Sequence, residues 1–162
     1  MDEKKYVAYV GTYTNGNSVG IHLFDLDVEN GTMTERKVIP INNPSYIKMS
    51  HNGKYLYSIA DEGVRSFVVE PDGDLQPLNC AGIEGMRGCY LSTDKDDHYL
   101  FVAGWHDGKV TVMRLNEDGT VGRMTQRTGQ RCREKFQTSC ELCKSDAGRE
   151  ISLCRGSGNG SD

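Results

Sequence analysis

The sequence predicts an all-β fold built from a repeated unit of strands and tight turns. Three observations support this prediction. Glycine is frequent and proline rare, with 19 residues against 4, which is typical of a chain with many turns. Segments rich in valine and tyrosine, which favour strands, alternate with short polar stretches. One such segment recurs 44 residues later in the chain.

The first unit is a partial copy over residues 6–34. We expect one strand over residues 6–10 and the next over residues 20–26. The pair Asn30-Gly31 then closes the unit, because glycine tolerates the positive φ that a tight hairpin turn requires.

The second and third units are clear copies of one another. Residues 46–57 are echoed by residues 90–101, with Tyr55 and Tyr99 in equivalent positions. In each copy we expect two strands around a polar turn, then a third strand, and a closing Asp-Gly turn. The turns are at 51–53 and 94–97, the third strands at 64–69 and 109–113, and the closing pairs at 72–73 and 118–119. Short strands with a period in the forties are typical of a β-propeller, which has four strands per blade, rather than of a sandwich or barrel.

The composition changes near Gly122. All eight tyrosines, all four prolines and every valine lie before residue 123, whereas residues 123–162 hold six of the ten arginines and four of the six cysteines. The chain ends in a linker-like stretch of glycine and serine. We therefore divide it into residues 1–122, a partial propeller of about two to three blades, and residues 123–162, an unrelated tail expected to be irregular or disordered.

Two explanations of the tail stay open. Cys140 and Cys143 form a CxxC pair, which together with Cys132 and Cys154 offers four thiolates for zinc, although no second CxxC pair exists. The alternative is an out-of-frame reading. Residues 130–162, back-translated with suitable codons and read one nucleotide later, give a string containing LTPDGKYLCAV, a third copy of the repeat at residues 49–59. The position of this copy, where the next blade is due, favours the second explanation.

The bulk composition excludes several classes of function. A formal net charge of −4 does not support nucleic-acid binding, which requires a basic surface. No stretch reaches the roughly 20 apolar residues of a membrane helix, and residues 1–5 lead into a strand without the apolar core of a signal peptide. We expect a cytoplasmic protein with reduced cysteines and no cofactor.

Six further motifs follow one another along the chain: Tyr9-Val-Gly-Thr-Tyr-Thr14, Gly20-Ile-His-Leu-Phe-Asp25, Asn43-Pro-Ser-Tyr46, His51-Asn-Gly-Lys-Tyr-Leu-Tyr57, Gly85-Met-Arg-Gly-Cys89 and His106-Asp-Gly-Lys-Val110. Together and in this order they resemble the opening of the lactonase family of seven-bladed β-propellers. This resemblance covers about residues 5–122 and implies hydrolysis of 6-phosphogluconolactone, a small sugar lactone, in the pentose phosphate pathway. Seven blades at this period need about 320 residues, so the chain holds an open arc, expected to be marginally stable and to self-associate through its open blade edges.

Lactone hydrolysis needs a base for water, a donor for the developing oxyanion and a cation for the substrate phosphate. Glu62 follows a strand where the family often has an acid; the alternative is a solvated turn carboxylate. Arg87 enters a strand and could meet phosphate; the alternative is a surface arginine. His106 is a third candidate, or else a turn histidine, and His22 on a strand is interpreted as structural.

These candidates do not make a complete active site. The more distinctive histidine- and arginine-bearing stretch of the family lies further along, and in the shifted frame it falls within NFRPHVN, which this chain lacks. We therefore expect the chain itself to be inactive. Two other functions stay open: a non-catalytic propeller module that binds a partner, and a propeller fragment with a zinc-binding tail.

Overall fold

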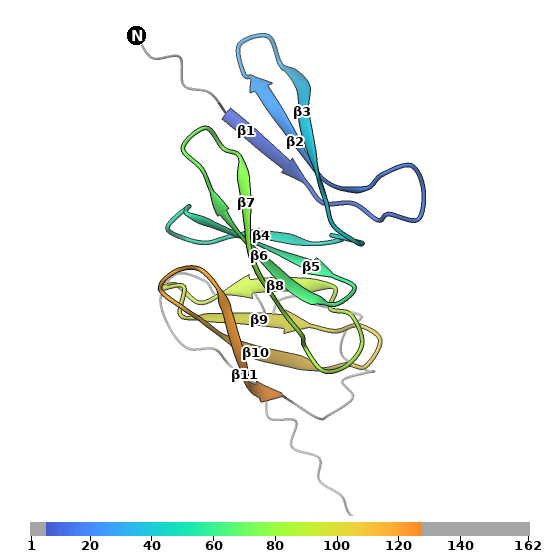
Figure 1. The fold of residues 1–162 in the computed structure, drawn as a ribbon, viewed down its shortest axis with the longest axis vertical. Coiled ribbons are helices and arrows are strands. Elements are labelled where there is room, and N and C mark those ends of the chain that lie inside the picture. Colours follow the sequence, from blue (N-terminus) through green and yellow to red (C-terminus); the bar gives the residue numbers. More distant parts are fainter. Residues whose placement is uncertain (1–5, 128–162) are drawn as a thin grey trace, which may run out of the picture.

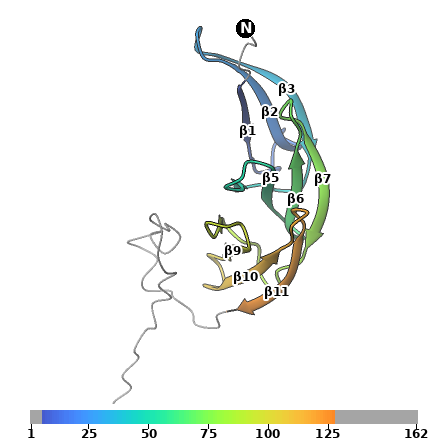
Figure 2. The same cartoon turned by 90° about the vertical axis from the view of Figure 1, so that its left-hand side faces the viewer.

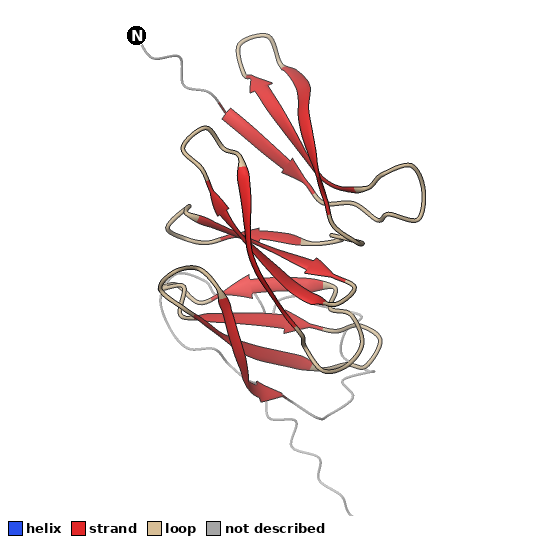
Figure 3. Cartoon of the chain, in the orientation of Figure 1, coloured by secondary structure: helices blue, strands red, loops and turns tan. Residues whose placement is uncertain are grey.

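The computed structural model describes residues 6–127 of the 162-residue chain. The tail cysteines, and the segment for which a shifted reading frame is one hypothesis, lie outside the described residues. The described part consists of strands joined by loops and turns (Figure 3), and it has no helix long and apolar enough to cross a membrane. The strands are β1 (Tyr6–Val10), β2 (Gly20–Asp27), β3 (Thr32–Pro40), β4 (Ile47–Met49), β5 (Tyr55–Ala60), β6 (Gly63–Val69), β7 (Leu75–Ala81), β8 (Tyr90–Thr93), β9 (Tyr99–Ala103), β10 (Val110–Leu115) and β11 (Val121–Arg127).

The strands form three antiparallel sheets in chain order. The first sheet is β1-β2-β3, the second β4-β5-β6-β7 and the third β8-β9-β10-β11. Within each sheet, every strand pairs with the next along the chain, as short turns between antiparallel strands allow. Figure 2 shows the sheets following one another along an arc. The all-β fold of blade-like sheets is confirmed.

The repeat seen in the sequence is the repeat of the sheets. Tyr55 opens β5 and Tyr99 opens β9, so the 44-residue echo relates the second sheet to the third. The first sheet has three strands, and β1 corresponds to β5 and β9. It therefore has no counterpart of β4 or β8 among the described residues. Strand β11 runs across the boundary expected at Gly122 and ends at Arg127.

The second sheet is buried on both faces because it lies between the other two. Successive residues of a strand point to opposite faces. Leu56 and Ala60 of β5 accordingly pack toward the first sheet, in a cluster with Phe67. Tyr57 and Ile59 pack toward the third sheet. All four β5 residues are at most 1% exposed, which explains why β5 is almost continuously apolar.

The connections between strands gather at two ends of the molecule. Because the strands alternate in direction, successive connections fall at opposite ends; one end lies on the right in Figure 1 and holds the longer loops together with the two-residue β5–β6 turn. We call the first the loop end; it consists of residues 11–19, 41–46, 61–62, 82–89 and 104–109. We call the second the turn end; it consists of residues 28–31, 50–54, 70–74, 94–98 and 116–120.

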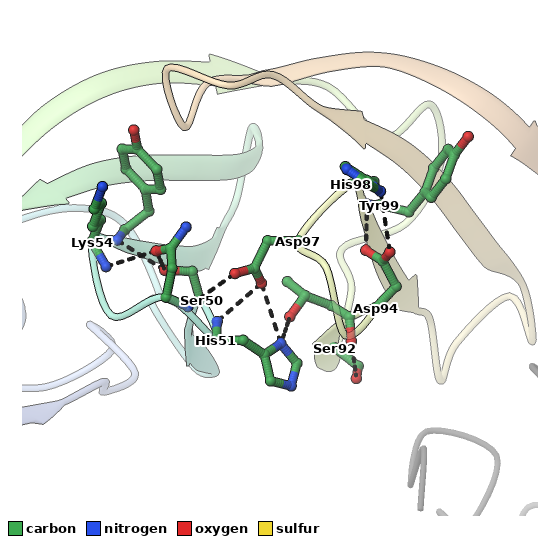
Figure 4. Close-up of polar contacts among 11 residues, drawn as sticks. Ser50, His51, Lys54, Ser92, Asp94, Asp97, His98 and Tyr99 are labelled. Carbon is green, nitrogen blue, oxygen red and sulfur yellow. Dashed lines mark hydrogen bonds and ion pairs between the residues drawn. The ribbon is translucent and has the colours of Figure 1, made fainter. Parts of the chain in front are cut away.

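At the turn end, Asp97 locks the third sheet to the second (Figure 4). Its carboxylate accepts the backbone N–H groups of His51 and Asn52 at 3.0 and 3.1 Å, and it lies 3.3 Å from the imidazole of His51. Burial works to raise the pKa of the Asp97 carboxyl, but the hydrogen bonds outweigh burial, so the pKa lies below its ordinary value. Asp97 has a φ of 55° and occupies the position that Gly53, with a φ of 71°, holds in the preceding repeat. The strained conformation is thus retained where the carboxylate has a partner.

Candidate functional site

The three candidates from the sequence all lie at the loop end, on three different connections. Glu62 is in the β5–β6 turn, Arg87 in the β7–β8 loop and His106 in the β9–β10 loop. The structure shows no hydrogen bond or ion pair between any two of them. Their shared location fits a site at one end of a propeller, but their catalytic roles stay predictions.

Arg87 is held by the carboxylate of Asp61. Its Nη1 donates to Asp61 Oδ1 at 2.9 Å, and the Arg87 side chain is 30% exposed. The same carboxylate accepts the side-chain amide of Asn43, at 2.9 and 3.1 Å from its two oxygens. Asp61 therefore joins the β3–β4, β5–β6 and β7–β8 connections, and through them all three sheets. The other N–H groups of Arg87 make no hydrogen bond to a described residue.

Residues of the β1–β2 loop also contact Arg87 and Asn43. The guanidinium carbon of Arg87 lies 5.3 Å from the centre of the Tyr13 ring, within the range of a cation–π contact. The backbone N–H of Thr14 donates to Asn43 Oδ1 at 2.9 Å, and the Thr14 hydroxyl accepts the N–H of Asn43 at 3.2 Å. We call Tyr13, Asn43, Asp61 and Arg87 the Arg87 cluster. It presents a fixed, partly neutralised cation at the loop end.

Sequence reasoning found Arg87 but not the residues that hold it. Tyr13 and Asn43 occur in two of the family-like motifs, which was the available signal, although neither was singled out. Asn43 has a φ of 49°, a conformation that asparagine tolerates better than most residues. The role of Asp61 was not predicted. Its contact with Arg87 joins residues 26 positions apart, which the repeat pattern does not reveal.

Glu62 is engaged by a neighbour rather than by the Arg87 cluster. Its carboxylate accepts Nε of Arg65 at 2.7 Å and lies 2.5 Å from Nη2 of the same residue. Both side chains are more than a third exposed. Arg65 therefore occupies the Glu62 carboxylate, which is not left free to orient a water molecule toward a substrate.

His106 is exposed, and among the described residues it has no hydrogen-bond or ion-pair partner. No neighbouring carboxylate fixes the tautomer or the direction of its imidazole, as most catalytic histidines require. His22 lies on β2 in the first sheet, away from these loops, in a hydrogen-bond network with Ser18 and Glu35. That network fits the structural interpretation of His22.

Two further features of the surface lie away from the Arg87 cluster. At the turn end, ligand atoms of Asp94, Asp96 and His98 lie within 4.8 Å of one another, which is too few ligands for a calcium or magnesium site. An open groove of about 510 Å³ separates the outer strands β7 and β11. None of the residues predicted for catalysis lines it. The lining residues are Asn79, Cys80, Ala81, Gly82, Glu84, Val121, Gly122, Arg123 and Met124.

Comparison with known proteins places this arrangement among relatives. The model of the family described as "Lactonase, 7-bladed beta-propeller" matches residues 7–140. A 6-phosphogluconolactonase of Bacillus subtilis is 37% identical over 123 residues, which cover 72% of this chain and 35% of the relative. A 6-phosphogluconolactonase of Formosa agariphila is 28% identical, with 73% and 36% covered. The chain thus spans little more than a third of the length of these curated relatives.

Solved structures agree with the sequence relatives. A structure from Bacteroides fragilis superimposes with a TM-score of 0.72 at 29% identity, covering 79% of this chain and 37% of that one. The periplasmic gluconolactonase of Pseudomonas aeruginosa gives a TM-score of 0.70 at 27% identity, with 76% and 38% covered. Because this relative is described as periplasmic, the cytoplasmic location expected from the sequence stays a prediction.

Proposed function

Since this chain belongs to the lactonase family of seven-bladed β-propellers, we propose that it derives from an enzyme that hydrolyses a sugar lactone. We propose 6-phosphogluconolactone as the substrate and 6-phosphogluconate as the product. The 37% identity to the Bacillus subtilis 6-phosphogluconolactonase supports this choice. We further propose that the chain supplies only part of the active site and has no measurable turnover by itself.

The Arg87 cluster is the observation that carries the proposal. Asp61 holds one N–H of the guanidinium at 2.9 Å and Tyr13 lies under its face. The remaining donors form a planar fork, the geometry that recognises phosphate and carboxylate oxygens. Because Asp61 also fixes Asn43, the guanidinium is positioned before a ligand arrives, which lowers the entropic cost of binding. Arg87 is thus proposed to bind the substrate phosphate.

The proposed chemistry needs groups that the Arg87 cluster does not contain. Water attacks the lactone carbonyl carbon while a base takes its proton, the bond to the ring oxygen breaks, and that oxygen receives a proton. The products are a carboxylate and a hydroxyl group. Glu62 is paired with Arg65, and His106 has no orienting partner. Base catalysis contributes typically 10²–10⁴-fold, so the rate without a positioned base is expected to stay near that of the uncatalysed reaction.

Ligand titration followed by NMR tests the role of Arg87. The ¹⁵N-labelled chain is titrated with 6-phosphogluconate, and in parallel with gluconate, which lacks the phosphate. We expect shifts at Arg87, Tyr13 and Asn43 with the phosphorylated ligand, and much smaller shifts with gluconate. Arg87→Gln should abolish the difference between the two ligands. The control Arg114→Gln changes an exposed arginine of β10 and should retain it.

The proposal fails if 6-phosphogluconate causes no shift at the loop end, or if Arg87→Gln binds it as well as the unmodified chain does. Shifts of equal size for both ligands would also contradict a phosphate role. In that case the Arg87 cluster would be a purely structural joint between the three sheets.

A further inference from the structure

A chain of hydrogen bonds fastens the β1–β2 loop to the first sheet. Glu35 Oε2 on β3 lies 2.6 Å from Nδ1 of His22 on β2. Nε2 of His22 lies 2.8 Å from the hydroxyl oxygen of Ser18, and that oxygen lies 2.6 Å from the hydroxyl of Thr12. The Thr12 hydroxyl then donates to the carbonyl oxygen of Gly20 at 2.8 Å. Both ends of the loop, Thr12 and Ser18, are therefore tied to one histidine.

The distances resemble a catalytic triad of serine, histidine and carboxylate, but the protons are arranged differently. A carbonyl oxygen only accepts, so the single proton of Thr12 is used for Gly20. Ser18 must then donate its proton to Thr12. The Ser18 oxygen is left as an acceptor, so Nε2 of His22 carries a proton and donates it to Ser18. In this form the histidine already holds a proton on Nε2 and cannot take another from Ser18, so this serine is not poised as a nucleophile.

The same count assigns a charge to His22. Four links join Glu35, His22, Ser18, Thr12 and the carbonyl of Gly20, and each link needs one proton. The two hydroxyls supply two protons, so the ring must supply the other two, one from each nitrogen. Both nitrogens carry a proton only in the imidazolium form. A neutral ring leaves three protons for four links. When the ring keeps its proton on Nδ1, beside the Glu35 carboxylate, Nε2 accepts the proton of Ser18. The single proton of Thr12 can then reach either Ser18 or Gly20 but not both, so one link at Thr12 opens.

The surroundings of His22 leave Glu35 as its charged partner among the described residues. The His22 side chain is 21% exposed and the Glu35 side chain 48%. The ring stacks on Phe24 with centroids 6.3 Å apart, and Val10 lies opposite on β1. Ser18 faces it from the loop. No second acid or base from β1, β2, β3 or the loop is paired with it, so the ring and Glu35 set the state of the network.

The β1–β2 loop also carries Tyr13, a member of the Arg87 cluster, and Thr14, which contacts Asn43 of that cluster. Tyr13 lies under the Arg87 guanidinium, and Thr14 exchanges hydrogen bonds with Asn43. Both lie between Thr12 and Ser18 in the sequence. Loss of either link at Thr12, to Ser18 or to Gly20, would loosen the loop that places Tyr13 and Thr14.

We propose that His22 is a positioning residue that makes the Arg87 cluster dependent on pH. In its imidazolium form His22 closes the hydrogen-bond chain, holds residues 11–19 in place and keeps Tyr13 under Arg87. When His22 loses a proton one link opens, the loop loosens, and the cluster loses its support. Its relevance to a substrate rests on the proposed function, but the effect itself needs no ligand.

An NMR titration of the ligand-free ¹⁵N- and ¹³C-labelled chain tests the proposal. Long-range ¹H–¹⁵N spectra give the charge and tautomer of each imidazole, while the Arg87 δ-protons report the ring current of Tyr13 and the Thr14 amide reports its bond to Asn43. As His22 deprotonates, we expect the Arg87 δ-protons to lose their upfield shift and the Thr14 amide to lose its protection from exchange. Both changes should have the same midpoint pH as the His22 signals. Unchanged Arg87 and Thr14 signals through the His22 titration would overturn the proposal.

Variants separate positioning from simple stability. Glu35→Gln keeps the shape but removes the negative charge beside the ring, so the midpoints of His22, Arg87 and Thr14 should all move together to lower pH. The control His98→Gln changes a histidine at the turn end whose side chain is 72% exposed, and all three midpoints should stay in place. If Glu35→Gln moves the His22 midpoint alone, the link to the Arg87 cluster is refuted. No sugar is present, so the outcome is independent of the 6-phosphogluconate titration.

Discussion

The lock formed by Asp97 makes a prediction in which two effects oppose each other. Asp97→Gly removes a carboxylate that accepts two backbone N–H groups, from His51 and Asn52. It also relieves the positive φ of 55°. Each hydrogen bond to a charged group contributes about 1.5–3 kcal/mol, whereas a left-handed conformation costs a residue other than glycine about 1–2 kcal/mol. The Asp97 side chain is only 9% exposed, so little screening by water is expected. The loss should dominate, and the free energy of unfolding should fall by about 1–5 kcal/mol.

Asp97→Asn separates the charge from the shape. Asparagine tolerates positive φ and keeps one oxygen acceptor, so its cost should be about 1 kcal/mol at neutral pH. The hydrogen bonds lower the folded-state pKa of Asp97 relative to its ordinary value. The stability that the carboxylate adds is therefore present above the unfolded-state pKa of about 3.9 and is lost as the pH falls through the lower folded-state pKa. The difference between the two proteins should accordingly be constant near pH 7 and disappear in acid.

Urea unfolding followed by far-ultraviolet circular dichroism at pH 7 and at pH 3 measures these differences. The control Asp96→Asn makes the same change at the exposed neighbour in the same turn and should alter stability by less than about 0.5 kcal/mol. The reasoning is refuted if Asp97→Gly is as stable as the unmodified chain at pH 7, since strain would then outweigh the hydrogen bonds. A difference between Asp97→Asn and the unmodified chain that persists unchanged at low pH would refute the role of the charge.

Three further predictions concern packing and the origin of the tail. Gly119→Ala should destabilise the protein more than Gly31→Ala. Both glycines have positive φ, 81° and 64°, which costs alanine about 1 kcal/mol at either position, but a Cβ on Gly119 would also meet the Tyr55 ring, whereas Gly31 faces open space. Equal losses of stability in urea unfolding would contradict this contact. Phe67→Ala, at 1% exposure between the first two sheets, should cost about 3–5 kcal/mol and lower the thermal midpoint, whereas an unchanged midpoint would mean that the sheets do not share this core. Sequencing the gene beyond codon 115 should reveal a one-nucleotide shift that restores Gly-Lys-Tyr-Leu repeats, and DNA unable to encode them in any frame would dismiss the out-of-frame explanation.

The sequence predicted the repeat more fully than the contacts between repeats. Tyr55 and Tyr99 located equivalent strands, because strand propensity and turn chemistry are local and recur with every sheet. The role of Asp97 could not be predicted this way. It departs from the glycine of the preceding repeat, and its partners are the backbone of another sheet. The pairing of Glu62 with Arg65, three residues away, could have been predicted from their spacing in the sequence. Glu62 was instead interpreted as a candidate catalytic acid.

The sequence predicted where the candidate site lies, but not the contacts that hold its side chains. Strand order alone brings Glu62, Arg87 and His106 to one end of the molecule, because alternate connections of antiparallel strands lie at the same end. The anchoring of Arg87 by Asp61 and Tyr13 depends on side-chain directions in three loops, which no pattern in one sequence specifies. The tail beyond residue 127, with its cysteines, lies outside the described residues, and both explanations of it stay hypotheses.

A turnover assay of the purified chain tests most directly the claim that this chain carries only part of a lactonase active site. Freshly generated 6-phosphogluconolactone is added to the 162-residue chain, and its disappearance is compared with buffer and with Arg87→Gln. We expect the same first-order rate constant in all three, together with binding of 6-phosphogluconate that requires Arg87. Hydrolysis clearly faster than in buffer and lost in Arg87→Gln would contradict this expectation, and would show that residues of this chain form a complete catalytic site.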